Sequence, residues 1–254
     1  MRYFIHLSYK GTKYHGWQIQ PNAITIQELL QKALSVLLKT NTEIIGAGRT
    51  DTGVHASFFI AHFDTTNSID CKTLCLALNR TIPFDIAIHS IFQVADDAHS
   101  RFSALSRTYN YHISLTKDPF TLETSTYIWG NLDVDSMNKA CDILFEYTDF
   151  TSFSKLHTDT FTNNCRIMKA QWTITENNKL LFTIKADRFL RNMVRAIVGT
   201  MLEIGRGKRT LDDFRSIIES KDRSKAGVSA PAQGLFLCAI EYPFEFLTTK
   251  ELKG

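Results

Sequence analysis

One acidic side chain, Asp51, stands in a setting that suits chemistry on a bound ligand. It lies in residues 48–55, Gly-Arg-Thr-Asp-Thr-Gly-Val-His, with Arg49 two residues before it and His55 four residues after it. The flanking glycines let the backbone turn sharply and come close to a ligand. A carboxylate held there can act as a nucleophile or as a general acid or base. An alternative is a structural turn in which Asp51 caps its own loop.

A second group of residues combines arginines with aromatic rings. Arg101 and Phe102 are followed by Arg107, Tyr109 and Tyr111. Arginine supplies contacts to phosphates, and the face of a tyrosine can stack on an unstacked base. The same pattern also fits a half-buried edge strand whose arginines extend into the solvent. The residues therefore indicate either an RNA-binding strand or an ordinary sheet edge.

A third group is basic. Arg188, Arg191 and Arg195 are spaced by three and four residues, which predicts that they share one face of a long helix. Arg195 lies within an apolar stripe, so we expect it to point into a cleft and to pair with a carboxylate. A solvated basic stripe is the alternative, and it fits Arg188 and Arg191 better than Arg195.

The common cofactor and metal motifs are missing from the sequence. A dinucleotide loop, Gly-x-Gly-x-x-Gly, would need glycine at position 51, where the carboxylate of Asp51 would repel a pyrophosphate. The phosphate-binding Gly-Lys-Ser/Thr and the metal-binding His-Glu-x-x-His are also missing, as is the Pro-Cys-x-x-Cys of zinc deaminases. We therefore expect no metal site.

The elements that must position these residues form two similar series. Residues 1–104 alternate as strand, helix, strand, strand, helix, strand, with a helix from Thr25 to about Lys39 and the Asp51 loop between two strands. Residues 105–254 repeat that order with one extra helix, a hairpin at Asn177-Asn178 and a last strand at 235–241. The predicted fold is α+β, with two ferredoxin-like (split β-α-β) halves whose sheets, antiparallel or mixed, join around a central cleft.

Composition narrows the class of protein. The 254 residues are 44% hydrophobic and 22% charged, with a net charge of +3, which is ordinary for a globular chain. The five cysteines include no Cys-x-x-Cys pair, which indicates reduced thiols in a cytoplasmic protein. The first residues do not form a signal peptide, and no apolar stretch approaches the ~20 residues that span a bilayer. We therefore expect no membrane segment.

Together these segments resemble the tRNA pseudouridine synthase A family. Residues 48–56 are similar to its catalytic signature, Gly-Arg-Thr-Asp followed by a small residue and Gly-Val-His. Further similar segments run along the whole chain, at residues 14–18, 78–79, 96–97, 99–104, 107–111 and 149–153, at Phe189 with 193–195, and at 230–232 with 234–235. The chain departs from the family at Lys10, where aspartate is usual, at Thr52, where alanine is commoner, and at Arg191-Asn192, which replace a pair that often contains histidine.

The resemblance implies isomerisation of uridine to pseudouridine in the anticodon stem-loop of tRNA, at positions 38 to 40. It implies a homodimer in which one tRNA contacts both subunits, and no metal or organic cofactor. The uridine must first leave the RNA helix, which costs a few kcal/mol. Arg101 is expected, by resemblance, to hold the vacated space or the flipped phosphate.

The resemblance makes Asp51, Tyr109 and Arg195 the expected catalytic residues. Asp51 must be a carboxylate, and a guanidinium from the second half, that of Arg195, is its expected partner. Asp51 could attack C1′ of the ribose, add to C6 of the uracil or remove the ribose 2′ proton, and the sequence leaves these three routes open. Tyr109 is expected to stack on the freed uracil. The residues expected to bind substrate are Arg49, His55, Arg101, Arg107 and Arg191.

Three other functions compete with this one. A non-catalytic RNA-binding module would explain the arginines and aromatics but not the setting of Asp51. A glycoside hydrolase would need two working carboxylates, and only one acid has a site-like setting. The third alternative is a pseudouridine synthase that acts on another RNA or another tRNA position.

Overall fold

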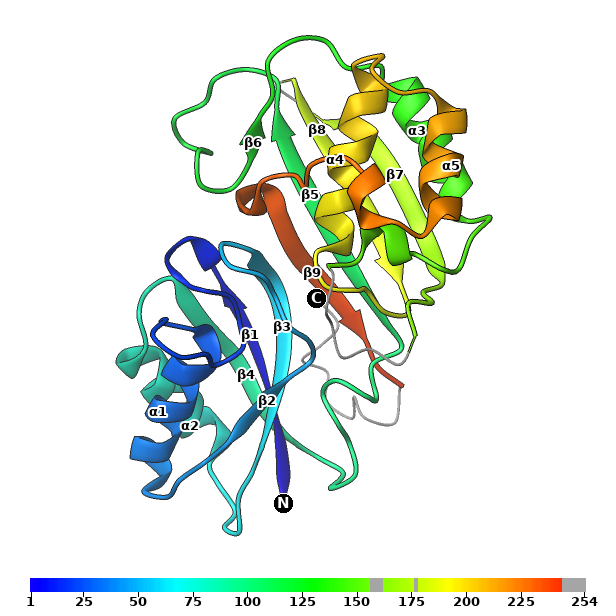
Figure 1. The fold of residues 1–254 in the computed structure, drawn as a ribbon. Coiled ribbons are helices and arrows are strands. Elements are labelled where there is room, and N and C mark those ends of the chain that lie inside the picture. The colour runs from blue at the N-terminus through cyan, green and yellow to red at the C-terminus, as the bar shows by residue number, and fades with distance from the viewer. Residues whose placement is uncertain (156–161, 176–177, 244–254) are drawn as a thin grey trace. The chain divides into compact units, whose positions relative to one another are not determined.

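The computed structural model describes residues 1–155, 162–175 and 178–243 (Figure 1). The chain divides into two compact units, and each is described by itself. Unit 1 comprises Met1–Ser106 together with the segment that begins at Leu237, and unit 2 comprises Arg107–Phe236. No helix among the described residues is long and apolar enough to span a membrane.

Unit 1 has the predicted strand, helix, strand, strand, helix, strand order. β1 lies between β3 and β4 and is antiparallel to both, so that Ile5 faces Ala61 on one side and Ile91 on the other. β2 pairs with β3. The elements are β1 (Arg2–Tyr9), α1 (Ile26–Leu38), β2 (Ile44–Gly46), β3 (His55–Asp64), α2 (Cys71–Thr81) and β4 (Ile86–Val94).

Local sequence explains where α1 begins and ends. The Thr25 hydroxyl accepts a hydrogen bond from the Glu28 amide, which caps the first turn. Lys39 adopts the left-handed conformation (φ 56°) and ends the helix. The Glu28 carboxylate forms an ion pair with Lys32, which lies one turn further along the helix.

The core of unit 1 lies between its sheet and its two helices, which stand side by side in Figure 1. Alternate residues of β1, namely Tyr3, Ile5, Leu7 and Tyr9, are buried, because successive side chains point to opposite faces of a strand. Trp17 adds a buried ring that stacks on Phe59, with ring centroids 4.3 Å apart. Fully buried members of this core include Ile5, Leu7, Leu30, Leu34, Phe59 and Leu78.

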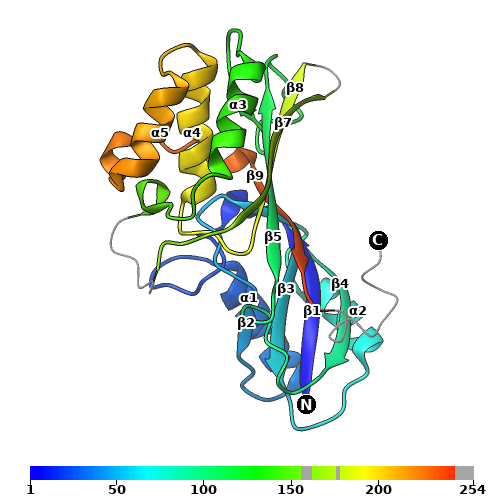
Figure 2. The same ribbon diagram turned by 90° about the vertical axis from the view of Figure 1, so that its right-hand side faces the viewer.

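Unit 2 repeats the order with additions. β8 lies between β5 and β7 and is antiparallel to both, while the short β6 runs parallel to β5. Figure 2 shows α3, α4 and α5 together on one face of this sheet. The elements are β5 (Ser106–Ser114), β6 (Thr126–Tyr127), α3 (Val134–Leu144), β7 (Ile167–Thr175), β8 (Lys179–Ala186), α4 (Met193–Gly205), α5 (Leu211–Ser220) and β9 (Leu235–Glu241). The α+β class predicted from the sequence is confirmed. In the predicted hairpin, Asn177 lies outside the described residues, and Asn178 has a φ of 55°.

The end of the last strand groups with unit 1, whereas the sequence placed it in a half that runs from residue 105 to the end. Hydrogen bonds explain this grouping. The Leu105 amide donates to the Glu241 carbonyl at 2.7 Å, and the Ser106 hydroxyl donates to the Glu241 carboxylate at 2.8 Å. The Tyr242 hydroxyl donates to the Ser100 carbonyl at 2.5 Å. Such contacts between distant parts of the chain leave no local signal in the sequence.

The prediction that three arginines share one face of a helix is wrong. α4 begins at Met193, because Asn192 takes the left-handed conformation (φ 67°) and the chain before it is not helical. Arg188 and Arg191 therefore precede the helix, and only Arg195 lies on it. The 3–4 spacing of charges was compatible with a helix, but it carried no information about where the helix starts.

Candidate active site

The loop that carries Asp51 joins β2 to β3 and is held by its own backbone. The Val54 amide donates to the Asp51 carbonyl at 3.1 Å, and Gly53 has a φ of 77°, which glycine adopts without strain. Thr50 is buried, and its hydroxyl shares a 2.9 Å hydrogen bond with the Tyr9 hydroxyl. Asp51 is half-buried and Arg49 is exposed. The residues on both sides of Asp51 are thus fixed, while its side chain keeps part of its surface accessible.

A second loop, Gly11–Trp17, lies directly against the Asp51 loop. The Trp17 amide donates to the Thr50 carbonyl at 3.3 Å, and the Gly53 amide donates to the Tyr14 carbonyl at 3.2 Å. These backbone hydrogen bonds clamp the Asp51 turn from both ends. The sequence matched residues 14–18 to the family but did not predict that this loop supports Asp51, because the two segments are more than thirty residues apart.

His55 is the first residue of β3 and is completely buried. Its Nδ1 accepts a hydrogen bond of 2.9 Å from the Gly11 amide. This bond ties the start of the second loop to the end of the Asp51 turn. The arrangement makes His55 a residue that positions the two loops, and its contact with a substrate stays a prediction.

Gly16 allows the two loops to approach this closely. It has a φ of +84°, and a Cβ added there would lie 2.2 Å from the Thr50 carbonyl oxygen. We expect Gly16→Ala to lower the free energy of unfolding by at least about 1–3 kcal/mol, because it adds backbone strain to a steric clash. Gly48→Ala is the matched control, since a Cβ at Gly48 meets nothing within 4 Å. Urea unfolding of both variants checks this, and equal stabilities would contradict the close approach.

Tyr14 anchors the second loop to the start of β4. Its hydroxyl donates to Asp85 Oδ1, and the Lys10 amide donates to the Asp85 carbonyl at 2.8 Å. Burial, together with the neighbouring carboxylate of Asp85, raises the pKa of Tyr14 above its ordinary value. Tyr14 therefore remains a neutral hydrogen-bond donor. The sequence did not predict this pair, since an aspartate just before a strand resembles an ordinary turn residue.

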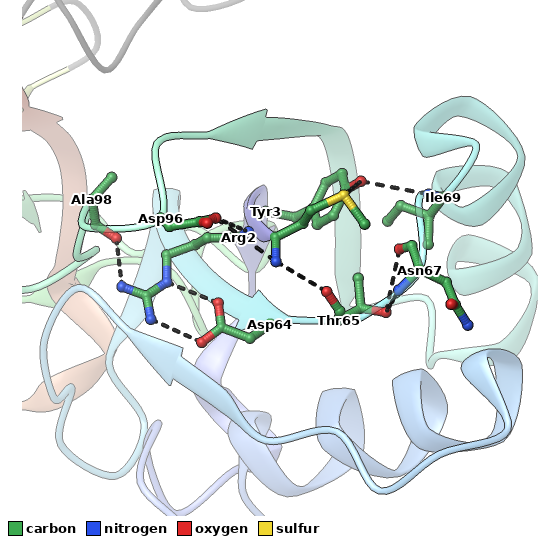
Figure 3. A network of polar contacts seen from close by, with 9 residues as sticks. Arg2, Tyr3, Asp64, Thr65, Asn67, Ile69, Asp96 and Ala98 are labelled. Atoms are coloured by element: carbon green, nitrogen blue, oxygen red, sulfur yellow. Dashed lines mark hydrogen bonds and ion pairs between the residues drawn. The ribbon is translucent and has the colours of Figure 1, made fainter.

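The segment that carries Arg101 is anchored in unit 1 by Arg2. Figure 3 shows the Arg2 guanidinium between Asp64, which it binds through two nitrogens at 2.8 and 2.9 Å, and the Ala98 carbonyl, which it reaches at 3.0 Å. The Arg2 amide also donates to Asp96 Oδ1 at 3.1 Å. Paired hydrogen bonds from a guanidinium hold a carboxylate in a defined geometry. The chain just before Arg101 is therefore held in place, while Arg101 itself is exposed.

His62 holds the same segment from within the sheet. Its Nδ1 shares a 2.8 Å hydrogen bond with the Ser100 hydroxyl, which also donates to the Ile45 carbonyl at 2.9 Å. Burial, with additional effects of the Arg2 and His99 charges, lowers the pKa of His62 from 6.5 to about 4. His62 is therefore neutral at pH 7.

The lowered pKa of His62 predicts a loss of stability in acid. The unfolded chain binds a proton at His62 below a pH of about 6.5, whereas the folded chain resists this protonation down to about 4. The free energy of unfolding should therefore fall as the pH drops through that range. In His62→Gln the fall should be shallower. Urea titrations of both proteins between these two pH values check this, and parallel pH curves would count against it.

In unit 2 the two tyrosines of β5 differ sharply. Tyr109 is half-buried and meets the Phe189 ring edge to face, at a centroid distance of 5.1 Å and an interplanar angle of 90°. Tyr111 is fully buried, and its hydroxyl donates to the Pro231 carbonyl at 2.8 Å. Tyr111 is thus a core residue, and Tyr109 keeps surface for a ligand. Arg107, on the same strand, donates to the Asp187 carbonyl at 3.0 Å.

Arg195 is positioned by the loop that precedes β9. Its Nε donates to the Ala230 carbonyl at 2.7 Å, and the Ala230 amide donates to the Arg195 carbonyl at 2.9 Å. Asn192 Nδ2 donates to the Ser229 hydroxyl at 2.6 Å, and Arg223 donates to the same hydroxyl at 2.8 Å. The orientation of the Arg195 guanidinium therefore depends on a loop of small residues. The sequence matched residues 230–232 and 234–235 of this region to the family, but it did not predict the contacts that Asn192 and Arg223 make with Ser229.

Each unit thus brings some of the predicted residues together. In unit 1, Arg49 and Asp51 lie in the loop between β2 and β3, His55 begins β3, and Arg101 lies on a separately anchored segment. In unit 2, Arg107 and Tyr109 lie on β5, and Arg195 lies on α4, with Arg191 exposed just before that helix. The predicted pairing of Asp51 with Arg195 joins residues of different units and stays a prediction. Among the described residues, no three or more His, Cys, Asp or Glu side chains are arranged to hold a metal ion.

Comparisons with known proteins give one consistent family. A sequence model of the family described as tRNA pseudouridine synthase matches residues 147–243. Among similar proteins, the tRNA pseudouridine synthase A of Bacteroides thetaiotaomicron is 54% identical over 255 residues, which cover 100% of this chain and 95% of that protein. Its counterpart in Bacteroides fragilis is 57% identical over 245 residues, covering 96% and 97%. A more distant counterpart from Thermoanaerobacter is 42% identical over 243 residues, covering 94% and 98%.

Proposed function

The chain belongs to the tRNA pseudouridine synthase A family, and from this premise we propose that it isomerises uridine to pseudouridine in the anticodon stem-loop of tRNA, at positions 38 to 40. The reaction breaks the N1–C1′ bond of the nucleoside and forms a C5–C1′ bond. Nothing is oxidised or reduced overall, so the isomerisation itself needs no redox cofactor. What the protein must supply is a reactive group, a place for the flipped uridine and contacts to the RNA.

The immobilised Asp51 turn carries this proposal. Residues on both sides of Asp51 are fixed by hydrogen bonds to Tyr9, Tyr14 and Trp17, and its side chain remains partly accessible. A carboxylate so positioned reacts without first having to be ordered, which is how preorganised groups contribute to catalysis. We assign Asp51 to the step that frees the base from C1′. The three routes of attack named above all use this same carboxylate.

Tyr109 and Arg195 complete the proposed catalytic set. The ring of Tyr109 is braced by Phe189, so it can receive a stacked uracil without reorienting. Through Nε, Arg195 is held by Ala230, which leaves the two terminal nitrogens of the guanidinium in a defined plane. In the proposal this plane binds the carboxylate of Asp51 and keeps it ionised, because a guanidinium favours the charged form.

The remaining predicted residues are proposed to bind the RNA. Arg49, Arg101 and Arg191 are exposed, and Arg107 is half-buried. Guanidinium groups bind phosphates well because their donors are planar and forked. His55 contributes by holding the two loops that carry Asp51 and its support.

We further propose that the protein works as a homodimer in the cytoplasm, where its tRNA substrate is found, and that it uses no metal or organic cofactor. A reducing compartment agrees with the cysteines, since Cys141 and Cys165 are buried thiols and the sequence has no Cys-x-x-Cys pair. Burial raises the pKa of the Cys141 and Cys165 thiols to about 12, so these two stay protonated and unreactive.

Tritium release tests the proposed reaction directly. When the base is reattached through C5, the hydrogen on C5 leaves, so tRNA labelled with tritium at C5 of uridine should release tritium to water. Unmodified anticodon stem-loops with uridine at position 38, 39 or 40 test the site. A protein that binds tRNA but releases no tritium would instead be an RNA-binding module, and release from another position would move the site.

Binding should depend strongly on salt. Phosphate contacts release counterions, so tRNA affinity should fall roughly 10³–10⁵-fold between about 50 and 200 mM salt if six to ten phosphates are contacted. Filter binding across a salt series measures the slope. A flat titration would contradict recognition through the exposed arginines.

A further inference from the structure

An exposed aromatic ring stands beside Arg101. Phe102 is 75% exposed, yet it belongs to a segment whose backbone is tightly held. The Arg101 guanidinium lies over the Phe102 ring, 5.4 Å from its centroid. Exposing an apolar ring of this size to water is unfavourable, but single exposed rings are common on protein surfaces, so exposure by itself does not indicate a binding site. What distinguishes Phe102 from such rings is the way in which its segment is held.

Phe102 forms the outer end of a column of rings that begins in the core. The His99 ring lies 4.4 Å from the Phe102 ring, and the His62 ring lies 4.6 Å from the His99 ring in an edge-on arrangement. His62 is buried, His99 is half-buried and Phe102 is exposed. The column therefore runs from the interior of unit 1 to its surface and ends in a ring capped by a cation.

The backbone under this column is rigid. His99 Nδ1 accepts hydrogen bonds from the amides of both Arg101 and Phe102, at 3.1 and 3.2 Å. Ser103 closes the turn by donating its amide to the His99 carbonyl at 3.0 Å. Below the turn, Ala98 is held by Arg2, as Figure 3 shows. The Phe102 ring is thus presented in a preorganised position, so a ligand that stacks on it pays little ordering entropy.

We propose that Arg101 and Phe102 together form a stacking platform for an unpaired nucleobase of the tRNA substrate. Every base has a π-face that can stack on an aromatic ring or on a guanidinium plane, and the cation beside the ring attracts the adjoining phosphate. The platform gives the RNA a second attachment in unit 1, on a different segment from the Asp51 turn. It rests on the proposed function because it requires an RNA with unstacked bases, such as those of an anticodon loop.

The charge at the site favours RNA as the occupant. The group next to the ring is a guanidinium, and the anchoring acids Asp64 and Asp96 are engaged by Arg2 and by the chain's amino terminus. The carboxylates of Asp64 and Asp96 are therefore bound at Arg2, whereas the Arg101 guanidinium lies over the Phe102 ring. A positive group over an exposed ring complements a base attached to a phosphate.

Replacement of the ring tests the platform. Phe102→Ala should weaken binding of an anticodon stem-loop by roughly 5- to 150-fold, the range expected for loss of one stacked base. Phe102→Trp should keep the affinity near that of the wild type, and Phe102→Leu, which is apolar but not aromatic, should bind like Phe102→Ala. The matched control is Phe84→Ala, since Phe84 is a fully exposed ring of unit 1 outside this column. Thermal unfolding of each variant confirms that the fold is retained.

The outcomes separate the platform from the proposed reaction. The platform would be overturned if Phe102→Ala or Phe102→Leu bound the stem-loop as tightly as the wild type does. Tritium release by the wild type would in that case still support the proposed reaction. Equal losses for Phe84→Ala and Phe102→Ala would also overturn it, because they would indicate general surface apolarity. A wild-type protein that binds the stem-loop and releases no tritium would overturn the reaction but not the platform.

Fluorescence gives a second readout of the platform. When the RNA is added, the tryptophan emission of Phe102→Trp should be quenched more than that of the wild type.

Discussion

Asp51→Asn is expected to abolish pseudouridine formation while tRNA binding stays close to that of the wild type. The substitution keeps the size and shape of the side chain and removes its charge and its ability to act as a nucleophile or base. Loss of a group that takes part directly in bond making or proton transfer typically costs at least roughly 10²–10⁴-fold in rate. Single-turnover tritium release with saturating enzyme gives the rate, and filter binding gives the affinity.

The loop itself should survive this change. The contacts that hold the Asp51 turn include those of the Asp51 backbone, of Thr50 and of the Gly53 amide, and asparagine leaves all three in place. The thermal midpoint of the variant should therefore match that of the wild type within a few degrees. A lower midpoint together with lost activity would indicate a structural effect and not a chemical one.

Glu43→Gln is the matched control for Asp51→Asn. Glu43 is an exposed acid of unit 1 just before β2, so its substitution removes the same charge from the same unit. It should leave turnover unchanged. Appreciable pseudouridine formation by Asp51→Asn would refute the assignment of this carboxylate.

Arg195→Lys is expected to lower turnover strongly although the positive charge is retained. The Arg195 guanidinium uses Nε to bind the Ala230 carbonyl and has further donors in the same plane. Lysine is a point charge on a flexible stem, so it cannot bind the carbonyl and a carboxylate in one fixed plane. Loss of one hydrogen bond to a charged group costs about 1.5–3 kcal/mol, or roughly 10- to 150-fold in rate.

The loss in Arg195→Lys should appear in kcat and not in KM. The proposed role is to hold the Asp51 carboxylate, and that role is separate from binding of the RNA. Arg206→Lys is the matched control, because Arg206 is exposed at the other end of α4. Single-turnover rates at several tRNA concentrations separate the two effects. An unchanged kcat, or an equal loss for Arg206→Lys, would count against the pairing.

Most helices and strands could be predicted because their signals are local. The caps at Thr25, Asp70 and Thr210 lie next to the turns that they stabilise, and the alternation along β1 and β7 is visible in short windows. The start of α4 was mispredicted for the same reason. Its boundary depends on a left-handed Asn192, whose side chain binds Ser229 in a loop far along the chain.

The same distinction between local and distant signals applies to the candidate functional residues. Asp51 could be identified from its neighbours because the glycines and threonines around it form a continuous motif. Its support could not, because Tyr9, Tyr14 and Trp17 reach it through backbone and hydroxyl contacts whose partners are remote in sequence. Nothing near His55 in the sequence distinguishes a buried acceptor for a loop amide from a residue that touches a ligand.

The sequence by itself determined which residues are available for chemistry, the type and order of most helices and strands, and the family to which the chain belongs. All of these depend on short-range patterns or on continuous motifs. The tertiary structure decided which residues support the reactive ones: the loop clamped against Asp51, the carbonyl that orients Arg195, the column beneath Phe102 and the unit in which the last strand ends. Such contacts form only when distant segments pack together, so the energies that select them do not appear in any local stretch of sequence.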